Sequence, residues 1–139
     1  MGNSMGGYGA LKWGLNQPQH FSRIVALSAV VDLADFYEKR AIFAMPDFNL
    51  VFDEQDIHAK PLALDATLAQ YDSAQWPLDI YTACGEEDPL YAPNLAFSHQ
   101  LQATFGDHYT WTSLPGDLDW DFWDQQLATA FTWLTTTEG

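Results

Sequence analysis

The sequence predicts an α/β fold in which parallel β-strands are covered by crossover helices. Short apolar segments typical of buried strands alternate with longer segments of helical period, in the order helix, strand, helix, strand, helix, strand, helix. The chain has 139 residues, of which 47% are hydrophobic, enough for one packed core. No repeat or linker divides the sequence, so residues 1–139 are expected to belong to a single domain.

The first half of the chain contains one clear strand among helical segments. Residues 5–15 follow a glycine cluster and favour a helix that packs closely on another element. Residues 23–28 are mostly apolar and branched, as expected of a parallel strand covered on both faces. Residues 34–51, interrupted by Pro46, indicate a helix followed by irregular structure. A further helix is predicted to begin at Pro61.

The second half repeats the alternation with stronger signals. Residues 78–84 predict a second strand, and residues 109–113 alternate like a third. Between them, residues 93–105 have apolar side chains near the helical period, and Gly106 is the expected stop. Residues 120–134 predict a terminal helix, with one apolar face made by Trp120, Trp123, Leu127, Phe131 and Leu134.

Charge and composition exclude several classes of function. Five Lys and Arg residues against nineteen Asp and Glu give a net charge of −14, which disfavours nucleic acid and membrane-surface partners. The longest apolar run, residues 24–31, is far shorter than the ~20 residues of a membrane span. With Cys84 as the only cysteine, we expect a small buried side chain, no disulfide and no multi-cysteine metal site. No signal peptide is recognised, so a cytoplasmic location is expected.

The N-terminus carries a motif with chemical meaning. Gly2, Ser4 and Gly6 match the Gly-x-Ser-x-Gly nucleophile elbow, in which a serine occupies a strained turn between a strand and a helix. Glycines two residues to either side are expected because side chains there would clash. The alternative interpretation is that these glycines are only turn residues at a helix start.

Two further motifs support the elbow. Cys-Gly-Glu-Glu-Asp at residues 84–88 follows the second strand, and Pro-Gly-Asp-Leu-Asp-Trp at residues 115–120 precedes the last helix. Together with residues 2–12, they resemble the esterase family of tributyrin esterases and S-formylglutathione hydrolases, within the α/β-hydrolase superfamily. The resemblance implies a partial α/β-hydrolase fold with about three parallel strands. The chain would be its C-terminal portion, starting at the elbow, with the N-terminal strands missing.

The resemblance also implies roles for individual residues. Ser4 corresponds to the acyl-accepting nucleophile, Asp88 to the acid of the triad, and Met5 to the donor of one oxyanion-hole N–H. The implied substrate is a small ester or thioester, with no cofactor. We also expect no metal, because Asp117 opens a sequence like a calcium loop but Phe122 stands where that loop requires glycine.

The pattern departs from the family at the base. Relatives have histidine where this chain has Leu118, and leucine can neither accept nor return a proton. Asp117 and Asp119 flank this position, but ordinary carboxylates are weak bases for this task. The histidines elsewhere are expected to have structural or solvated roles, with His108 at the opposite edge of the sheet; they are His20, His58, His99 and His108.

The sequence therefore predicts a member of an esterase family whose isolated chain is inactive. A complementing N-terminal half, or self-association through the exposed sheet edge, is the expected partner. Two alternatives remain open from the residues alone. One is a pseudoenzyme related to the hydrolases but catalytically silent, and the other is an acidic interaction module that never used the elbow for chemistry.

Overall fold

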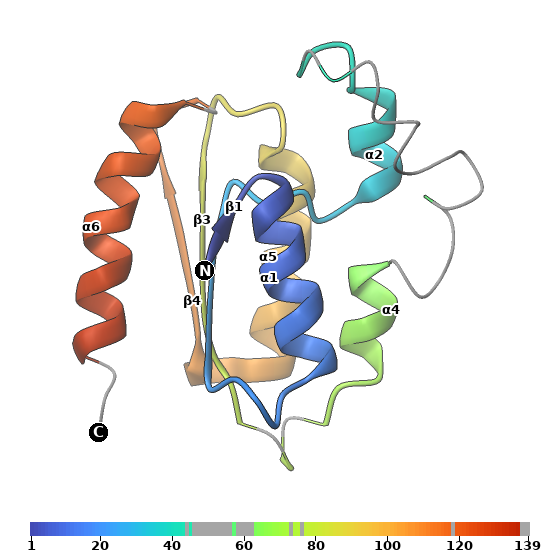
Figure 1. Ribbon diagram of the computed structural model, residues 1–139, viewed down its shortest axis with the longest axis vertical. Helices are drawn as coiled ribbons and strands as arrows, with labels where there is room; N and C mark the ends of the chain where they lie inside the picture. Colours follow the sequence, from blue (N-terminus) through green and yellow to red (C-terminus); the bar gives the residue numbers. More distant parts are fainter. Residues whose placement is uncertain are drawn as a thin grey trace.

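The described part of the chain folds around one parallel sheet of four strands in the order β1-β2-β3-β4 (Figure 1). This computed structural model describes residues 1–43, 45, 57, 63–72, 74–75, 77–117 and 119–136. The strands are β1 (Gly2–Asn3), β2 (Arg23–Leu27), β3 (Asp79–Gly85) and β4 (Tyr109–Leu114). The helices are α1 (Met5–Asn16), α2 (Leu33–Glu38), α4 (Leu64–Ala69), α5 (Tyr91–Phe105) and α6 (Trp120–Thr136), with the short 3-10 helix η3 (Gly106–His108) before β4.

The sheet has helices on both faces. In Figure 1, α6 lies on one side, and α1, α4 and α5 lie on the other. Alternate residues of β2 serve the two sides: Ile24 and Ala26 join the larger core with α1, α4 and α5, whereas Val25 and Leu27 join the smaller core under α6. The predicted α/β class with a parallel sheet is confirmed.

Close packing of α1 on the sheet explains two of its glycines. A Cβ on Gly7 would lie 2.7 Å from the Cβ of Ala29, and one on Gly14 would lie 2.3 Å from Cδ1 of Ile24. Between them, Tyr8 is buried at the sheet. The predicted close contact of this helix is therefore confirmed, and glycine is what allows it.

The terminal helix buries part of the face predicted for it, because Trp123, Leu127 and Leu134 pack on the smaller core. Trp120 and Phe131 are 72% and 57% exposed, so their assignment to the apolar face was wrong. The buried line of α6 is instead Phe122, Gln126 and Ala130, at spacings of four. Gln126 is polar yet buried because its Oε1 accepts a hydrogen bond of 3.0 Å from the Tyr81 hydroxyl. The buried side of α6 thus includes a polar residue, which apolar spacing alone does not indicate.

Other elements follow the prediction with shifted ends. Gly106 ends α5 with φ 55°, as expected of a glycine stop. The helix expected at Pro61 begins at Leu64, with Pro61 outside the described residues. The helix expected within 34–51 is α2, and most of that segment beyond residue 43 lies outside the described residues. The strand β1, paired in parallel with Ala26 and Leu27, was not predicted.

Within the described residues, no helix is long and apolar enough to cross a membrane.

Candidate active site

Ser4 occupies the turn between β1 and α1, at the carboxyl end of the sheet. Its backbone has φ 52° and ψ −121°, a region that non-glycine residues rarely adopt. The conformation is held from both sides, because the Ser4 N–H donates to the Leu27 carbonyl at 3.0 Å and the Ser4 carbonyl accepts from Val30 N at 3.0 Å. The serine therefore has the strained backbone of a nucleophile elbow.

The two glycines of the elbow, Gly2 and Gly6, differ in whether the structure leaves room for a side chain. A Cβ on Gly2 would lie 2.1 Å from the Gly6 carbonyl oxygen, so the expected steric need is confirmed at Gly2. At Gly6 the expectation was wrong, because a Cβ there meets nothing within 4 Å. The carbonyl of Gly6 packs against Gly2, while the other side of its Cα faces open space.

Met5 begins α1 immediately after Ser4. The first backbone N–H groups of a helix have no acceptor within the helix. In this turn the N–H groups of Gly7 and Tyr8 both donate to the Ser4 carbonyl, at 3.0 and 3.2 Å. The Met5 N–H comes earlier in the same turn.

Asp88 lies in the turn after β3 and is only 4% exposed. Its Oδ1 accepts a hydrogen bond of 2.8 Å from the Leu90 N–H. Its Oδ2 is buried and has no hydrogen-bond partner among the described residues. Burial is the largest effect and raises the pKa of this carboxyl, whereas Leu90, Ser28 and Cys84 lower it. The nearby Asp117 carboxylate raises this pKa by the smallest effect. A buried acceptor atom is thus left open to a donor.

Ser28 is a residue of this region that the sequence motifs do not single out. It follows β2, is fully buried and has φ 46°. Its N–H donates to the Ala83 carbonyl at 2.8 Å, and its Oγ accepts from Trp123 Nε1 at 3.2 Å. It also helps to lower the pKa of Asp88. In the sequence, the indication of this residue is a serine at the end of an otherwise apolar strand.

Cys84 lies beside the same carboxyl at the end of β3. It is buried and unpaired, as expected from its place in an apolar strand. Burial raises the pKa of its thiol, and the nearby Asp88 raises it further. The neutral thiol is therefore a small packing group here.

The loop that carries position 118 is fixed to the turn that carries Asp88. Glu86 N donates to the Leu114 carbonyl at 2.9 Å, and Glu87 N donates to the Gly116 carbonyl at 3.0 Å. In return, Gly116 N donates to the Glu87 carboxylate. Position 118 is two residues after Gly116 in the sequence. These hydrogen bonds therefore hold the loop before α6 against the turn that carries Asp88.

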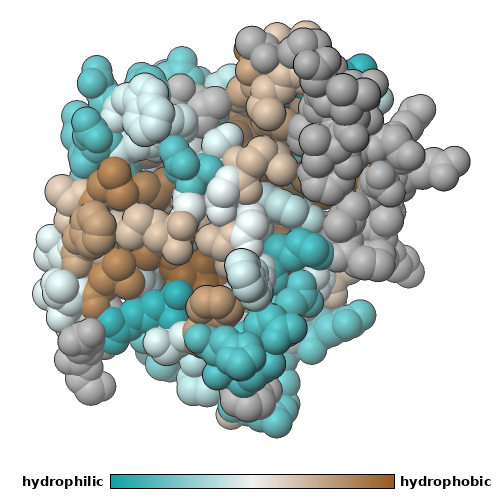
Figure 2. Space-filling view, viewed as in Figure 1, coloured by the Kyte–Doolittle hydropathy of each residue, from teal (hydrophilic) through white to brown (hydrophobic). Residues whose placement is uncertain are grey.

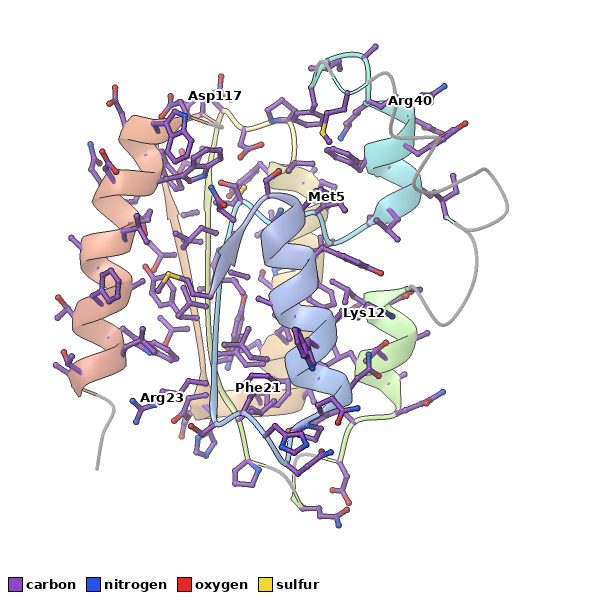
Figure 3. All side chains as sticks on the ribbon, viewed as in Figure 1. Met5, Lys12, Phe21, Arg23, Arg40 and Asp117 are labelled. Carbon is purple, nitrogen blue, oxygen red and sulfur yellow. The ribbon has the colours of Figure 1, made fainter. Side chains whose placement is uncertain are left out.

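Leu118 itself lies outside the described residues. Of the two carboxylates beside it, Asp119 accepts a hydrogen bond of 2.8 Å from Phe122 N through its Oδ1. This is the bond of a helix N-cap, so Asp119 begins α6. Asp117 acts on the Asp88 carboxyl by charge repulsion. Figure 3 shows Asp117 at the same end of the molecule as Met5.

The described histidines do not gather at this edge. His108 lies before β4, and its Nδ1 is 2.8 Å from Oδ1 of Asp79, the first residue of β3. His20 lies in the turn before β2, and His99 is exposed within α5, while His58 is outside the described residues. The expected position of His108 at the amino end of the strands is confirmed. Among the described residues, no group of His, Cys, Asp and Glu could hold a metal ion.

The fold and the strand-turn-helix at Ser4 define an α/β hydrolase. Residues 1–134 match the model of the family described as "Putative esterase", and the chain belongs to that esterase family. An acetyl esterase of Caldicellulosiruptor saccharolyticus is 32% identical over 149 aligned positions, which cover 96% of this chain and 53% of that protein.

Solved structures give the same result. The S-formylglutathione hydrolase FrmB of Staphylococcus aureus is 32% identical, with a TM-score of 0.66, over 95% of this chain and 52% of its own. FphF, a fluorophosphonate-binding serine hydrolase of the same organism, is 27% identical, with a TM-score of 0.73, over 95% and 51%. The chain therefore spans about half the length of the relatives that it matches.

Proposed function

We propose that this chain is the nucleophile-bearing part of a serine hydrolase acting on small esters or thioesters. The observation that carries the proposal is that two groups follow strands at the carboxyl edge of the sheet: Ser4, in a strained turn after β1, and Asp88, after β3, whose buried Oδ2 lacks a donor among the described residues. Acetyl esterase and S-formylglutathione hydrolase are the names of two relatives, so short acyl groups are the proposed substrates.

The proposed reaction is acyl transfer. The Ser4 hydroxyl attacks the carbonyl carbon, the Met5 N–H stabilises the oxyanion, and the alcohol or thiol leaves with a proton. Water then releases the acid from Ser4. Formation of the acyl-enzyme needs a base that accepts the Ser4 proton, and its hydrolysis needs the same base to accept a proton from water. In this proposal Asp88 Oδ2, buried and without a partner among the described residues, orients such a base by accepting its second N–H.

The chain as given lacks that base at the family position. Leu118 has no lone pair, and Asp119 is engaged as the N-cap of α6. In a serine protease, loss of the base costs about 10⁶ in turnover. We therefore propose that the isolated chain is catalytically silent, and that a complementing half supplies the remaining strands and the second oxyanion donor.

A second candidate is a pseudoenzyme that uses this fold as an acidic interaction module. The loss of histidine at position 118 and the net charge of −14 favour it. The maintained strain at Ser4 does not, because an interaction module would gain nothing from a serine at φ 52°.

Hydrolysis of p-nitrophenyl acetate separates these candidates. We expect no activity from the chain that depends on Ser4, as judged against Ser4→Ala. We expect activity only when Leu118→His is combined with a fusion to the unmatched half of the acetyl esterase. Ser4→Ala in that restored fusion is the control and should return the rate to background.

Other outcomes are also informative. Activity of the unaltered chain that disappears in Ser4→Ala would show that another group acts as the base. Rescue by the fused half alone would likewise show that catalysis proceeds with leucine at position 118. A restored fusion that stays inactive while it folds would favour the pseudoenzyme.

A further inference from the structure

A buried side-chain amide lies between the segment that holds Ser4 and the turn that carries Asp88. Asn94, in the first turn of α5, is only 3% exposed. Its Nδ2 donates to the carbonyls of Ala29 and Leu90, both at 2.8 Å. Because a backbone carbonyl only accepts, each of these bonds uses one of the two N–H groups of the amide. One side chain therefore joins the segment after β2 to the start of α5.

Ala29 belongs to the segment that holds Ser4. The next residue, Val30, donates its N–H to the Ser4 carbonyl at 3.0 Å. Ala29 itself is fully buried, and α1 packs so closely on it that a Cβ on Gly7 would lie 2.7 Å from the Ala29 Cβ. Figure 1 shows the starts of α1 and α5 at the same end of the sheet. A displacement of Ala29 would therefore displace the backbone of the elbow.

Leu90 belongs to the turn that holds Asp88. Its N–H donates to Asp88 Oδ1 at 2.8 Å. Its carbonyl accepts from the backbone N–H of Asn94 at 3.1 Å as well as from the side-chain amide. The Leu90 side chain is buried in the larger core. The Asp88 carboxyl is thus oriented by a residue whose carbonyl Asn94 holds.

The identity of residue 94 is explained by these two carbonyls. Asparagine is less favourable than leucine inside a helix, and a buried amide is costly unless it is hydrogen-bonded. The bond to Leu90 repeats one that the backbone of α5 already makes. The bond to Ala29 joins residues 65 positions apart and requires the side chain. It is therefore the contact that distinguishes asparagine from an apolar residue here.

We propose that Asn94 is a positioning residue, which fixes the Asp88 turn relative to the Ser4 turn by binding Ala29 and Leu90 at once. Its amide donates to backbone carbonyls and acts on the two functional groups through them. The inference rests on the proposed function, because the role belongs to acyl transfer. Its first test needs no hydrolysis, so its failure can be distinguished from a failure of the catalytic proposal.

The first test measures hydrogen exchange in the chain as given. The side-chain amide of Asn94 should exchange slowly, whereas that of Asn16, which is exposed and donates to the Lys12 carbonyl, should exchange fast. Rapid exchange of the Asn94 amide would overturn the proposal. This measurement needs no variant, so it decides the matter even if substitutions at position 94 prevent folding.

The variant Asn94→Leu extends this test. The amides of Val30 and Leu90 should exchange about tenfold faster than in the wild type, beyond any change in the middle of β2 and β3, because they bond Ser4 and Asp88. Ser98→Ala is the matched control, since it removes another buried polar group of α5 that donates only to Leu95. It should change these two amides no more than the strands.

A uniform change across both turns and the strands in Asn94→Leu would overturn the proposal, because Asn94 would then contribute only to overall stability. Figure 2 shows hydrophobic residues gathered on the surface between α6 and α1. Exchange rates of all the proteins are therefore compared at one low concentration, at which copies of the chain do not associate.

The second test uses the fusion restored with Leu118→His. Asn94→Leu should lower kcat for p-nitrophenyl acetate by about 10- to 100-fold with little change in KM. Added to Asp88→Asn, it should cost much less, because the carboxyl that it positions is already absent. An equal loss with and without Asp88 would overturn the proposal. Ser98→Ala should have the same small effect in both backgrounds. An inactive restored fusion would contradict the catalytic proposal, and the exchange rates would still decide the role of Asn94.

Discussion

Gly85 and Gly116 approach so closely that a Cβ on Gly85 would lie 2.2 Å from the Gly116 carbonyl oxygen. Gly85 ends β3 just before the Asp88 turn, and Gly116 belongs to the loop before α6. Two segments about thirty residues apart are thus held in backbone contact. This contact holds the turn after β3 and the loop before α6 against each other at the carboxyl edge of the sheet.

Gly85→Ala should destabilise the fold. The new methyl group would collide with a backbone carbonyl that is also hydrogen-bonded to Glu87 N, so the loop must shift. Overpacking of this kind costs about 1–3 kcal/mol. Urea unfolding followed by circular dichroism measures the cost. Gly9→Ala is the matched control and should instead stabilise by about 0.5–1 kcal/mol. Equal effects of the two would contradict the close contact.

Asp88→Asn should stabilise the isolated chain at neutral pH. Burial raises the pKa of the Asp88 carboxyl in the folded state above its ordinary value of 3.8. A raised carboxyl pKa means that its contribution to stability is full below that ordinary value and is lost as pH rises through the folded-state pKa. The variant has no carboxyl at this position and does not lose this stability. The difference in unfolding free energy between Asp88→Asn and the wild type should therefore grow as pH rises.

Unfolding free energies of both proteins between pH 4 and pH 7.5 measure this difference. Taking the difference cancels the other carboxyl groups, which both proteins share. Asp65→Asn, at an exposed position in the first turn of α4, is the control and should show no such growth. If the wild type instead becomes more stable relative to Asp88→Asn as pH rises, the assignment of Asp88 as a buried carboxyl with a raised pKa is contradicted.

Tyr81→Phe should weaken the attachment of α6 to the sheet. The Tyr81 hydroxyl donates to Gln126 Oε1 at 3.0 Å, and both residues are buried. Removing the hydroxyl leaves the Gln126 side chain without this partner, which costs about 1–3 kcal/mol. The double variant Tyr81→Phe with Gln126→Met should lose less than Tyr81→Phe alone, because no polar group then remains unpaired. Urea unfolding of the three proteins gives the comparison.

His108→Ala should leave stability nearly unchanged. The His108 ring is exposed, and its contact with Asp79 lies at the amino end of the strands. Exposed pairs of this kind contribute about 0–1 kcal/mol. In the fusion restored with Leu118→His, adding His108→Ala should leave the rate of ester hydrolysis unchanged. A large loss of hydrolysis would place His108 in the reaction and contradict the geometry.

Much of the fold could be predicted because its signals are local. The apolar run of β2, the glycine that ends α5 and the spacing within α5 each act within a few residues. The strand β1 could not be predicted, since two residues carry no period and form a strand only by pairing with Ala26 and Leu27. Gln126 was missed for a related reason, because its partner Tyr81 lies on another element.

The candidate site divides in the same way. Ser4 and Asp88 follow from motifs in which neighbouring glycines and turns determine the backbone. Ser28 acquires its place from β3 and Trp123, which contact it from 55 and 95 residues away, and no motif announces such contacts. The role of Asp119 as a helix cap also became clear only with the Phe122 N–H beside it.

Strand order in this sheet equals chain order. Among the described strands, none is inserted between two earlier ones, so those that follow Ser4 form one continuous block with a single seam at β1. A division just before the elbow therefore leaves these described strands together in one block. The same division offers protein engineers a place to build two-piece esterases whose reunion is reported by ester cleavage.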